Sequence, residues 1–195
     1  MTERYRRLYD RKQVQARIGE LAAQIIHDHQ RNNPLFVALL RGASPFATKL
    51  MFEIARQAPT MHPDLDYMMV STYGGSQHAG EPRIVTDLSP TTEVDGRYTI
   101  ILDDVRDLGI TGEFVEHHLL GLGALSVQLA VLAEKAVERT TTIEAAYCGF
   151  SVGDNWLVGM GMDDAQAGHE AYRWLDEIWE IRRDDEPPQL ALLGA

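Results

Sequence analysis

The chain has 195 residues, of which 45% are hydrophobic and 24% are charged, as expected for a globular protein with a core of its own. Its formal net charge of -11 argues against a nucleic-acid partner, because binding to phosphate backbones needs a surplus of Lys and Arg. The single cysteine excludes an intramolecular disulfide and indicates the reducing cytoplasm, and no apolar run is long enough to predict a membrane span.

Hydrophobic periodicity predicts alternating helices and strands along the first half of the chain. Residues 12–30 place apolar side chains at helical spacing, and the wholly apolar run 35–40 is typical of a strand covered on both faces. A serine followed by a proline predicts the start of a second helix over residues 44–57. We expect a strand over 65–73 and then a glycine-rich, mobile loop over 74–82.

The second half of the chain continues this alternation. A buried strand over 97–104 precedes a helix over 110–121, and three further strand candidates follow at 124–133, 145–150 and 156–163. We therefore expect a single domain over residues 1–182, of the α/β class, with a parallel sheet and right-handed crossovers. Residues 183–195 combine turn formers with no periodicity, which predicts a loosely ordered tail.

Three carboxylates stand at the end of the strand over 97–104, namely Asp103, Asp104 and Asp107. In parallel sheets ligands bind beyond the carboxyl ends of the strands, and a turn over 109–112 that opens a helix presents backbone N–H groups to an anion. Carboxylates beside such a turn are suited to sugar hydroxyls bridged by magnesium, which prefers oxygen ligands. The pattern predicts a site for a sugar phosphate and Mg²⁺, and the plain alternative is a solvated acidic loop.

Around this turn the chain resembles a known family. Residues 98–119 resemble the ribose-phosphate motif of type I phosphoribosyltransferases, in which an apolar strand precedes two acids and a turn rich in Thr and Gly. Further segments resemble the pyrophosphate loop, the flexible catalytic loop and the purine-pocket strands of the hypoxanthine-guanine branch, at 34–54, 66–88, 130–135 and 147–164. The resemblance implies the type I phosphoribosyltransferase fold, a mainly parallel central sheet flanked by helices, with a small hood formed by the terminal segments.

The resemblance also implies an activity and its partners. Such an enzyme transfers the phosphoribosyl group from phosphoribosyl pyrophosphate (PRPP) to hypoxanthine or guanine, and it releases a nucleoside monophosphate and pyrophosphate. It depends on Mg²⁺ and serves purine salvage in the cytoplasm. The implied partners are PRPP and a nucleobase, and the implied assembly is a homodimer or homotetramer.

The resemblance assigns roles to residues near the reacting atoms. Asp107 matches the general base that takes the N7 proton of the purine, Asp103 and Asp104 match the acidic pair that handles the ribose hydroxyls with Mg²⁺, and Asp163 matches a second metal carboxylate. The pyrophosphate loop, with its catalytic cation Arg41, is matched by Leu40, Arg41 and Gly42. The loop that closes over the reacting centre, with its catalytic Tyr73, is matched by Ser71, Thr72, Tyr73 and Gly74.

The remaining matches surround the 5′-phosphate and the base. The phosphate cradle is matched by Leu108, Gly109, Ile110, Thr111 and Gly112. Trp156 matches the aromatic residue that stacks on the base, and Leu157 matches the residue whose backbone contacts the base edge. Leu108 and Ile110 replace polar residues of the family motif, and the loss of one hydrogen bond to phosphate costs about 1.5–3 kcal/mol.

Two positions leave alternatives open. Glu144 stands where we expect a family Lys that donates to the 6-oxo group of the base, and a carboxylate accepts rather than donates. Glu144 therefore points to a same-fold enzyme for an amino-bearing base, unless Lys135 or Arg139 reaches the base or Glu144 faces solvent. His169 and Arg173 both lie near the place of a late family Arg that contacts pyrophosphate. A non-catalytic protein that binds PRPP or a nucleotide is the other alternative.

Overall fold

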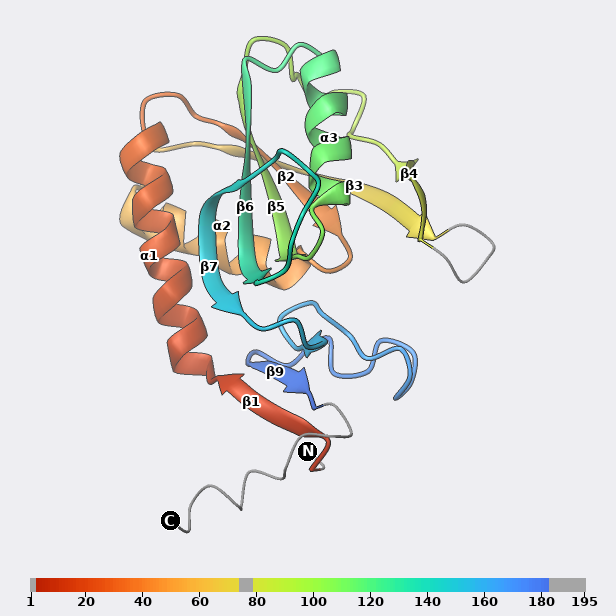
Figure 1. Cartoon of the computed structure of the whole chain (residues 1–195). Helices are drawn as coiled ribbons and strands as arrows, with labels where there is room; N and C mark the ends of the chain where they lie inside the picture. The colour runs from red at the N-terminus through yellow and green to blue at the C-terminus, as the bar shows by residue number, and fades with distance from the viewer. Residues whose placement is uncertain (1–2, 74–78, 183–195) are drawn as a thin grey trace.

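A six-stranded sheet forms the centre of the computed structural model of the chain, which describes residues 3–73 and 79–182. Its strands are β2 (Leu35–Leu40), β3 (Asp64–Tyr73), β4 (Ala79–Thr86), β5 (Tyr98–Arg106), β6 (Ser126–Lys135) and β7 (Ala145–Val152). They lie in the order β4-β3-β2-β5-β6-β7, and all neighbours are parallel except β4, which pairs antiparallel with β3. The parallel strands therefore bring their carboxyl ends to one edge of the sheet (Figure 1).

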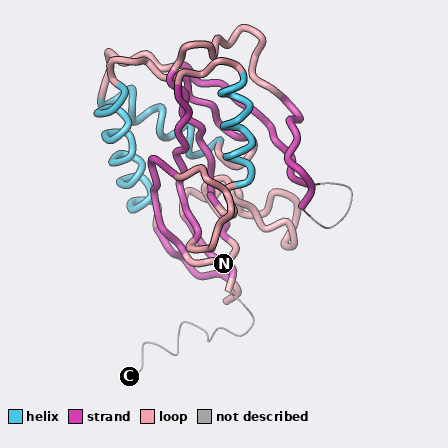
Figure 2. Tube along the Cα trace, turned by 45° about the horizontal axis from the view of Figure 1, so that its top comes forward, coloured by secondary structure: helices cyan, strands magenta, loops and turns pink. Residues whose placement is uncertain are grey.

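Three helices cover the two faces of this sheet (Figure 2). α1 (Arg11–His29) and α2 (Ser44–Gln57) pack on one face, and α3 (Ile110–Gly121) packs on the other. α1 begins at a reciprocal cap, in which the Asp10 side chain accepts from the backbone N–H of Gln13 and the Gln13 side chain accepts from the backbone N–H of Asp10, each at 2.9 Å. The alternation of strands and helices gives the α/β architecture.

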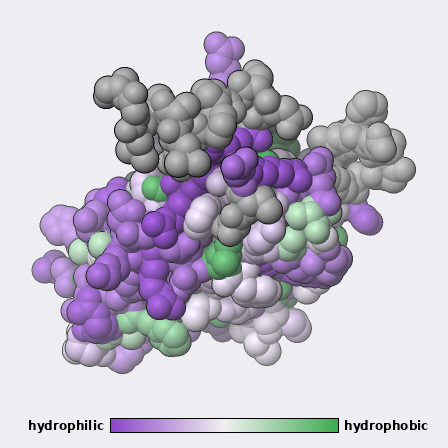
Figure 3. All heavy atoms as spheres, turned by 90° about the horizontal axis from the view of Figure 1, so that it is seen from below, coloured by the Kyte–Doolittle hydropathy of each residue, from purple (hydrophilic) through white to green (hydrophobic). Residues whose placement is uncertain are grey.

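A second, three-stranded sheet, the hood, lies beyond the carboxyl ends of the parallel strands (Figure 1). It consists of β1 (Tyr5–Tyr9), β8 (Leu157–Val158) and β9 (Ile178–Ile181) in the order β1-β9-β8. β1 and β9 are antiparallel, with Tyr5 opposite Ile181, so segments from opposite ends of the sequence lie side by side. Figure 3 looks at the molecule from this end and shows a described surface that is mostly hydrophilic.

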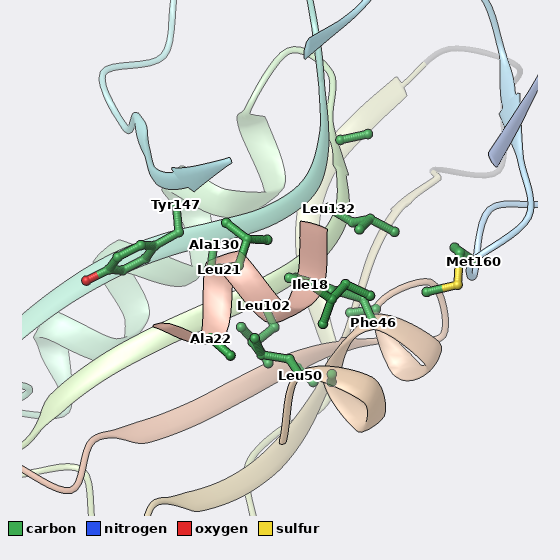
Figure 4. Close-up of a cluster of buried hydrophobic side chains, with 14 of the residues drawn as sticks. Ile18, Leu21, Ala22, Phe46, Leu50, Leu102, Ala130, Leu132, Tyr147 and Met160 are labelled. Atoms are coloured by element: carbon green, nitrogen blue, oxygen red, sulfur yellow. The ribbon is translucent and has the colours of Figure 1, made fainter. Parts of the chain in front are cut away.

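One cluster of buried apolar side chains packs α1 and α2 against the sheet and extends into the hood. Figure 4 shows Phe46 of α2 and Met160, which follows β8, in this cluster, together with Ile18, Leu21, Ala22, Leu50, Leu102, Ala130, Leu132 and Tyr147. Phe46 and Met160 are both fully buried. Burial of such a side chain contributes about 1.5–3 kcal/mol. The contact between Met160 and this cluster therefore helps to hold the hood on the main sheet.

The predicted fold class is confirmed, two predicted elements are wrong in part, and one strand is missing from the prediction. Part of the loop predicted over 74–82 is a strand, because Ala79 pairs with Tyr73 at the start of β4. The predicted strand over 156–163 shortens to β8, because Gly159 and Gly161 have φ values of +90° and +108° that end the extended backbone. β1 lies in a segment for which no individual strand is predicted, and it forms by pairing with β9 in the hood that the resemblance implies.

The glycine-rich tip at 74–78 and the tail at 183–195 lie outside the described residues, so the mobility and loose order predicted for them stay predictions. Within the described ranges, no helix has both the length and the apolar character needed to cross a membrane.

Candidate active site

Predicted site residues from three strands meet at the edge of the sheet beneath the hood. β2 leads into the turn of Leu40, Arg41 and Gly42, where the Leu40–Arg41 peptide bond is cis. β3 ends at residues 71–73, and the matched Gly74 lies outside the described residues. β5 carries the acidic pair and leads into the turn before α3. The topology thus brings together four of the segments that the sequence marks.

The turn after β2 is in direct contact with the acidic pair. A Cβ atom on Gly42 would lie 2.2 Å from the Oδ2 atom of Asp104. A Cβ atom on Gly161 would lie 1.7 Å from the carbonyl oxygen of Gly42. The backbone of Gly42 therefore lies against the side chain of Asp104 on one side and against Gly161 on the other, and a side chain at either glycine would force its neighbours to shift.

The acidic pair consists of two carboxylates that resist ionisation. Burial raises the pKa of Asp103 well above its usual value, and the neighbouring charge of Asp104 adds to the effect. Burial also raises the pKa of Asp104, although hydrogen bonds and the positive charge of Arg173 oppose it. A nearby cation would therefore stabilise the ionised pair.

These carboxylates fit a magnesium ion. Mg²⁺ is usually held by one or two protein carboxylates and completes its coordination with water and phosphate oxygens. Among the described residues no three His, Cys, Asp or Glu side chains converge on one point, which is the arrangement that a site made of protein ligands alone would need. The adjacent pair Asp103 and Asp104 is instead a partial site, in which water or the oxygen atoms of a bound ligand would complete the coordination.

A cavity beside Asp107 combines aromatic, apolar and charged walls, and it is lined by Asp104, Val105, Asp107, Lys135, Trp156, Leu157, Met162 and Asp163. The Nζ atom of Lys135 donates to Oδ2 of Asp107 at 2.6 Å and lies 5.6 Å from the ring centroid of Trp156. The indole N–H of Trp156 donates to the carbonyl of Asp163 at 2.7 Å, which fixes the ring. The cavity offers a flat ring, an ammonium donor and a carboxylate to a flat heterocycle.

On the other side of Asp107, residues 108–112 wrap around the start of α3 and line a second cavity. Gly109 has a φ of +81°, which favours glycine. The Thr141 hydroxyl donates to the carbonyl of Leu108 at 2.8 Å, and a Cβ atom on Gly109 would lie 2.5 Å from this hydroxyl. The shape of the turn is therefore set by its backbone and by the loop before β7.

The side chains of this turn contribute little polarity. Leu108 and Ile110 are 50% and 40% exposed and carry no polar side-chain atoms. Arg139 lies nearby, but its guanidinium supports the turn, with Nε donating to the carbonyl of Asp107 at 2.6 Å. An anion bound here would be held by backbone N–H groups at the helix start and by the hydroxyl of Thr111.

A chain of ion pairs connects the turn after β2 with the segment before β9. Arg173 is largely buried and donates to Oδ1 of Asp163 at 2.8 Å and to Glu170. Glu170 also accepts from Nη1 of Arg41 at 2.5 Å. His169 is exposed, whereas Arg173 connects the turn after β2, through Glu170, with the predicted metal carboxylate Asp163.

Glu144 lies away from this site, which contradicts the prediction that it contacts the base. It is exposed and directly precedes β7, at the amino end of a strand whose other end, Val152, pairs with Lys135. Lys135 lines the cavity instead, which is one of the alternatives that the sequence leaves open. The sequence signal that could have located Lys135 is its position at the end of an apolar strand, because parallel strands end at the same edge of the sheet as Asp107. No sequence signal marks Glu170.

Comparisons with known proteins agree with this geometry. Residues 4–165 match the phosphoribosyl transferase domain family, and this range includes the predicted site residues from Leu40 to Asp163 but not His169 or Arg173. A hypoxanthine-guanine phosphoribosyltransferase of Streptococcus mutans is 33% identical over 178 residues, which are 91% of this chain and 93% of that protein.

Solved structures are similar over nearly the whole chain. The crystal structure of a hypoxanthine phosphoribosyltransferase from Staphylococcus aureus has a TM-score of 0.80 at 28% identity and covers 91% of both chains. A hypoxanthine-guanine phosphoribosyltransferase from Bacillus anthracis has a TM-score of 0.78 at 27% identity and covers 90% of this chain and 97% of that one.

Proposed function

Because the chain belongs to the phosphoribosyltransferase family and is a transferase, we propose that it transfers the phosphoribosyl group of PRPP to a 6-oxopurine such as hypoxanthine or guanine. The observation that carries this proposal is the position of Lys135 in the cavity, between the carboxylate of Asp107 and the ring of Trp156. The names of the similar relatives support the same class of base.

The chemistry of Lys135 favours a base that carries a carbonyl group. An ammonium group donates hydrogen bonds and accepts none, so it fits a 6-oxo group and leaves a 6-amino group unpaired. Trp156 would stack on the flat ring, and the backbone of Leu157 would contact its edge. The exposed position of Glu144 removes the reason for proposing an amino-bearing base.

Asp107 would act as the general base of the reaction. A ring nitrogen of the purine forms the bond to C1 of the ribose as the bond from C1 to the pyrophosphate oxygen breaks, and the proton of the base passes to the Asp107 carboxylate. Lys135 orients this carboxylate through their hydrogen bond. A positioned base of this kind typically contributes about 10²- to 10⁴-fold to the rate.

The other charged residues would act on the sugar and on the leaving group. Arg41 and Arg173 would receive the negative charge that develops on pyrophosphate, since guanidinium groups match phosphate oxygens. Asp103 and Asp104 would hold Mg²⁺ next to the ribose hydroxyls, with Asp163 as the further carboxylate. When bound, the ion would neutralise phosphate charge.

Three further features complete the proposal. Residues 71–73, at the end of β3, would belong to the loop that covers the reacting centre and excludes water. We also propose that the protein is located in the cytoplasm, and its single cysteine is consistent with a reducing compartment. The assembly that we propose is a homodimer or homotetramer.

The test is pyrophosphate release from PRPP and Mg²⁺ with hypoxanthine, guanine, xanthine and adenine, for the wild type and for Asp107→Asn. We expect turnover with the 6-oxopurines, a loss of about 10²- to 10⁴-fold in Asp107→Asn, and PRPP binding that changes little. Asp87→Asn is the matched control, because Asp87 pairs with His118 away from the cavity. If the wild type binds PRPP but releases no pyrophosphate with any of these bases, the proposed activity is wrong and a regulatory role is favoured.

A further inference from the structure

Glu170 connects the two guanidinium groups on the pyrophosphate side of the site. One carboxylate oxygen accepts from Nη1 of Arg41 at 2.5 Å, and the other accepts from Nε of Arg173. The Glu170 side chain is only 23% exposed. A carboxylate that bridges two guanidinium groups satisfies the same donors that a phosphate group would use.

The position of this bridge is fixed by its surroundings. Arg173 also donates to the carbonyl of Gly161 and pairs with Asp163. Gly161 packs directly against Gly42, the residue that follows Arg41. The bridge therefore lies at the turn to which pyrophosphate binding is assigned.

Glu170 carries its negative charge at neutral pH. Partial burial raises the pKa of Glu170, but the hydrogen bonds and positive charges of Arg173 and Arg41 outweigh this effect and leave the pKa below its usual value. The backbone also presents this side chain in an unusual way, with a φ of +59° that a non-glycine residue adopts only at an energetic cost.

We propose that Glu170 is an intramolecular competitor of the diphosphate group, which must displace the Glu170 carboxylate from Arg41 and Arg173 when it binds. The proposal rests on the proposed function, because it concerns the PRPP and pyrophosphate subsite of that reaction. A ligand that binds only the form with released guanidinium groups has an apparent affinity lowered by the fraction of that form. Glu170 therefore weakens the binding of PRPP, and it assists release of pyrophosphate by recapturing the same two cations.

The experiment measures the binding of magnesium pyrophosphate alone by isothermal titration calorimetry, to the wild type, Glu170→Gln and Glu170→Asn. Gln keeps the size of the side chain without its charge, and Asn is well tolerated at positive φ but is shorter. We expect both variants to bind pyrophosphate about five- to tenfold more tightly, because the removed ion pairs are partly exposed and of moderate strength. Thermal unfolding verifies that each variant is folded.

Glu177→Gln is the matched control. Glu177 pairs with Arg7 at 3.1 Å, and the side chains of this pair are 24% and 52% exposed, against 23% and 56% for Glu170 and Arg41. This variant also loses one carboxylate near the hood, so an effect of net charge alone would appear in it equally. We expect its pyrophosphate affinity to equal that of the wild type.

The results separate this proposal from the proposed function. Pyrophosphate affinity that is unchanged or weaker in both Glu170 variants, with 6-oxopurine turnover present in the wild type, overturns the competitor role alone. Equal gains in Glu170→Gln and Glu177→Gln also overturn it, because they indicate a general charge effect. Absence of both turnover and pyrophosphate binding in the wild type overturns both proposals.

Discussion

Asp107 separates two flanks of the candidate site that are built in different ways. On one flank, here called the side-chain flank, charged side chains dominate, with Lys135 on Asp107 and Arg173 on Asp163. On the other flank, here called the backbone flank, residues 108–112 supply mainly backbone N–H groups at the start of α3, and two of their side chains are exposed and apolar. We therefore expect activity to be sensitive to substitutions of side chains on the side-chain flank, and to depend mainly on the shape of the backbone on the backbone flank.

Among the variants that compare the two flanks, the largest effect is expected from Lys135→Met on the side-chain flank. Met keeps an apolar stem beside Trp156 but removes the donor to Asp107 and, in the proposed reaction, the donor to the base. A hydrogen bond to a charged group is worth about 1.5–3 kcal/mol. We expect kcat/KM for hypoxanthine to fall about 100-fold, with little change in the KM for PRPP. Steady-state kinetics with each substrate varied separately measures both values.

Lys12→Met is the control for this prediction, since Lys12 is exposed in the first turn of α1. Normal kinetics in Lys135→Met would show that the side-chain flank does not depend on its cation. That outcome would reopen the question of which residue selects the base.

A smaller effect, in the opposite direction, is expected from Leu108→Thr on the backbone flank. The new hydroxyl would add one donor to the 5′-phosphate where Leu108 is half exposed. We expect PRPP to bind about three- to tenfold more tightly, because solvent reduces the value of a charge-assisted hydrogen bond at such a site. Calorimetric titration with PRPP and Mg²⁺ gives the affinity.

Leu122→Thr controls for the loss of an exposed leucine, because Leu122 is similarly exposed at the opposite end of α3. Unchanged PRPP affinity in Leu108→Thr would mean that backbone donors alone hold the phosphate. Side chains would then contribute even less to phosphate binding on the backbone flank than we propose.

The smallest effect is expected in stability, from Asp103→Asn between the flanks. The folded-state pKa of Asp103 is raised, so the folded protein binds more protons than the unfolded chain between the two pKa values, and its free energy of unfolding falls as pH rises through that window. Asn stays neutral, so we expect a Tm about 2–4 °C higher than that of the wild type at pH 7 without Mg²⁺.

Thermal scans at pH 7 and below the usual pKa of an aspartic acid test this sign. The difference between Asp103→Asn and the wild type should vanish at the lower pH, where both side chains are neutral. Asp64→Asn, which removes an exposed partner of Arg97, should not raise the Tm. A Tm of Asp103→Asn at or below that of the wild type at pH 7 would contradict the raised pKa.

Local sequence was sufficient for the elements whose burial follows a period. The apolar run of β2 and the helical spacing of α1 and α2 predict their bounds closely, because each buries a continuous face against the same core. The family motif likewise located the acidic pair and Asp107. The confirmed fold and enzyme class follow from these local signals.

The errors lie where function depends on which strand ends meet. Glu144 and Lys135 are both charged residues bordering apolar strands, and only the parallel register of β6 and β7 separates them to opposite edges of the sheet. The local sequence does not predict β1, because its partner, β9, is far away in sequence, and only the resemblance implies a hood formed by the terminal segments. Glu170 gives no pattern at all, since its role comes from two arginines that converge on it in space.

The hood has a consequence for the order in which the protein matures during synthesis. β9 is the central strand of the hood, and the N–H of Ile181 donates to the carbonyl of Trp156 at 2.7 Å. Ribosomes add about 5–20 residues per second, so Ile181, which donates to the carbonyl of Trp156, is synthesised about 1–5 seconds after Trp156. All six strands of the main sheet are synthesised before β9, so the wall of the cavity beside Trp156 is completed only after the sheet beneath it has been made.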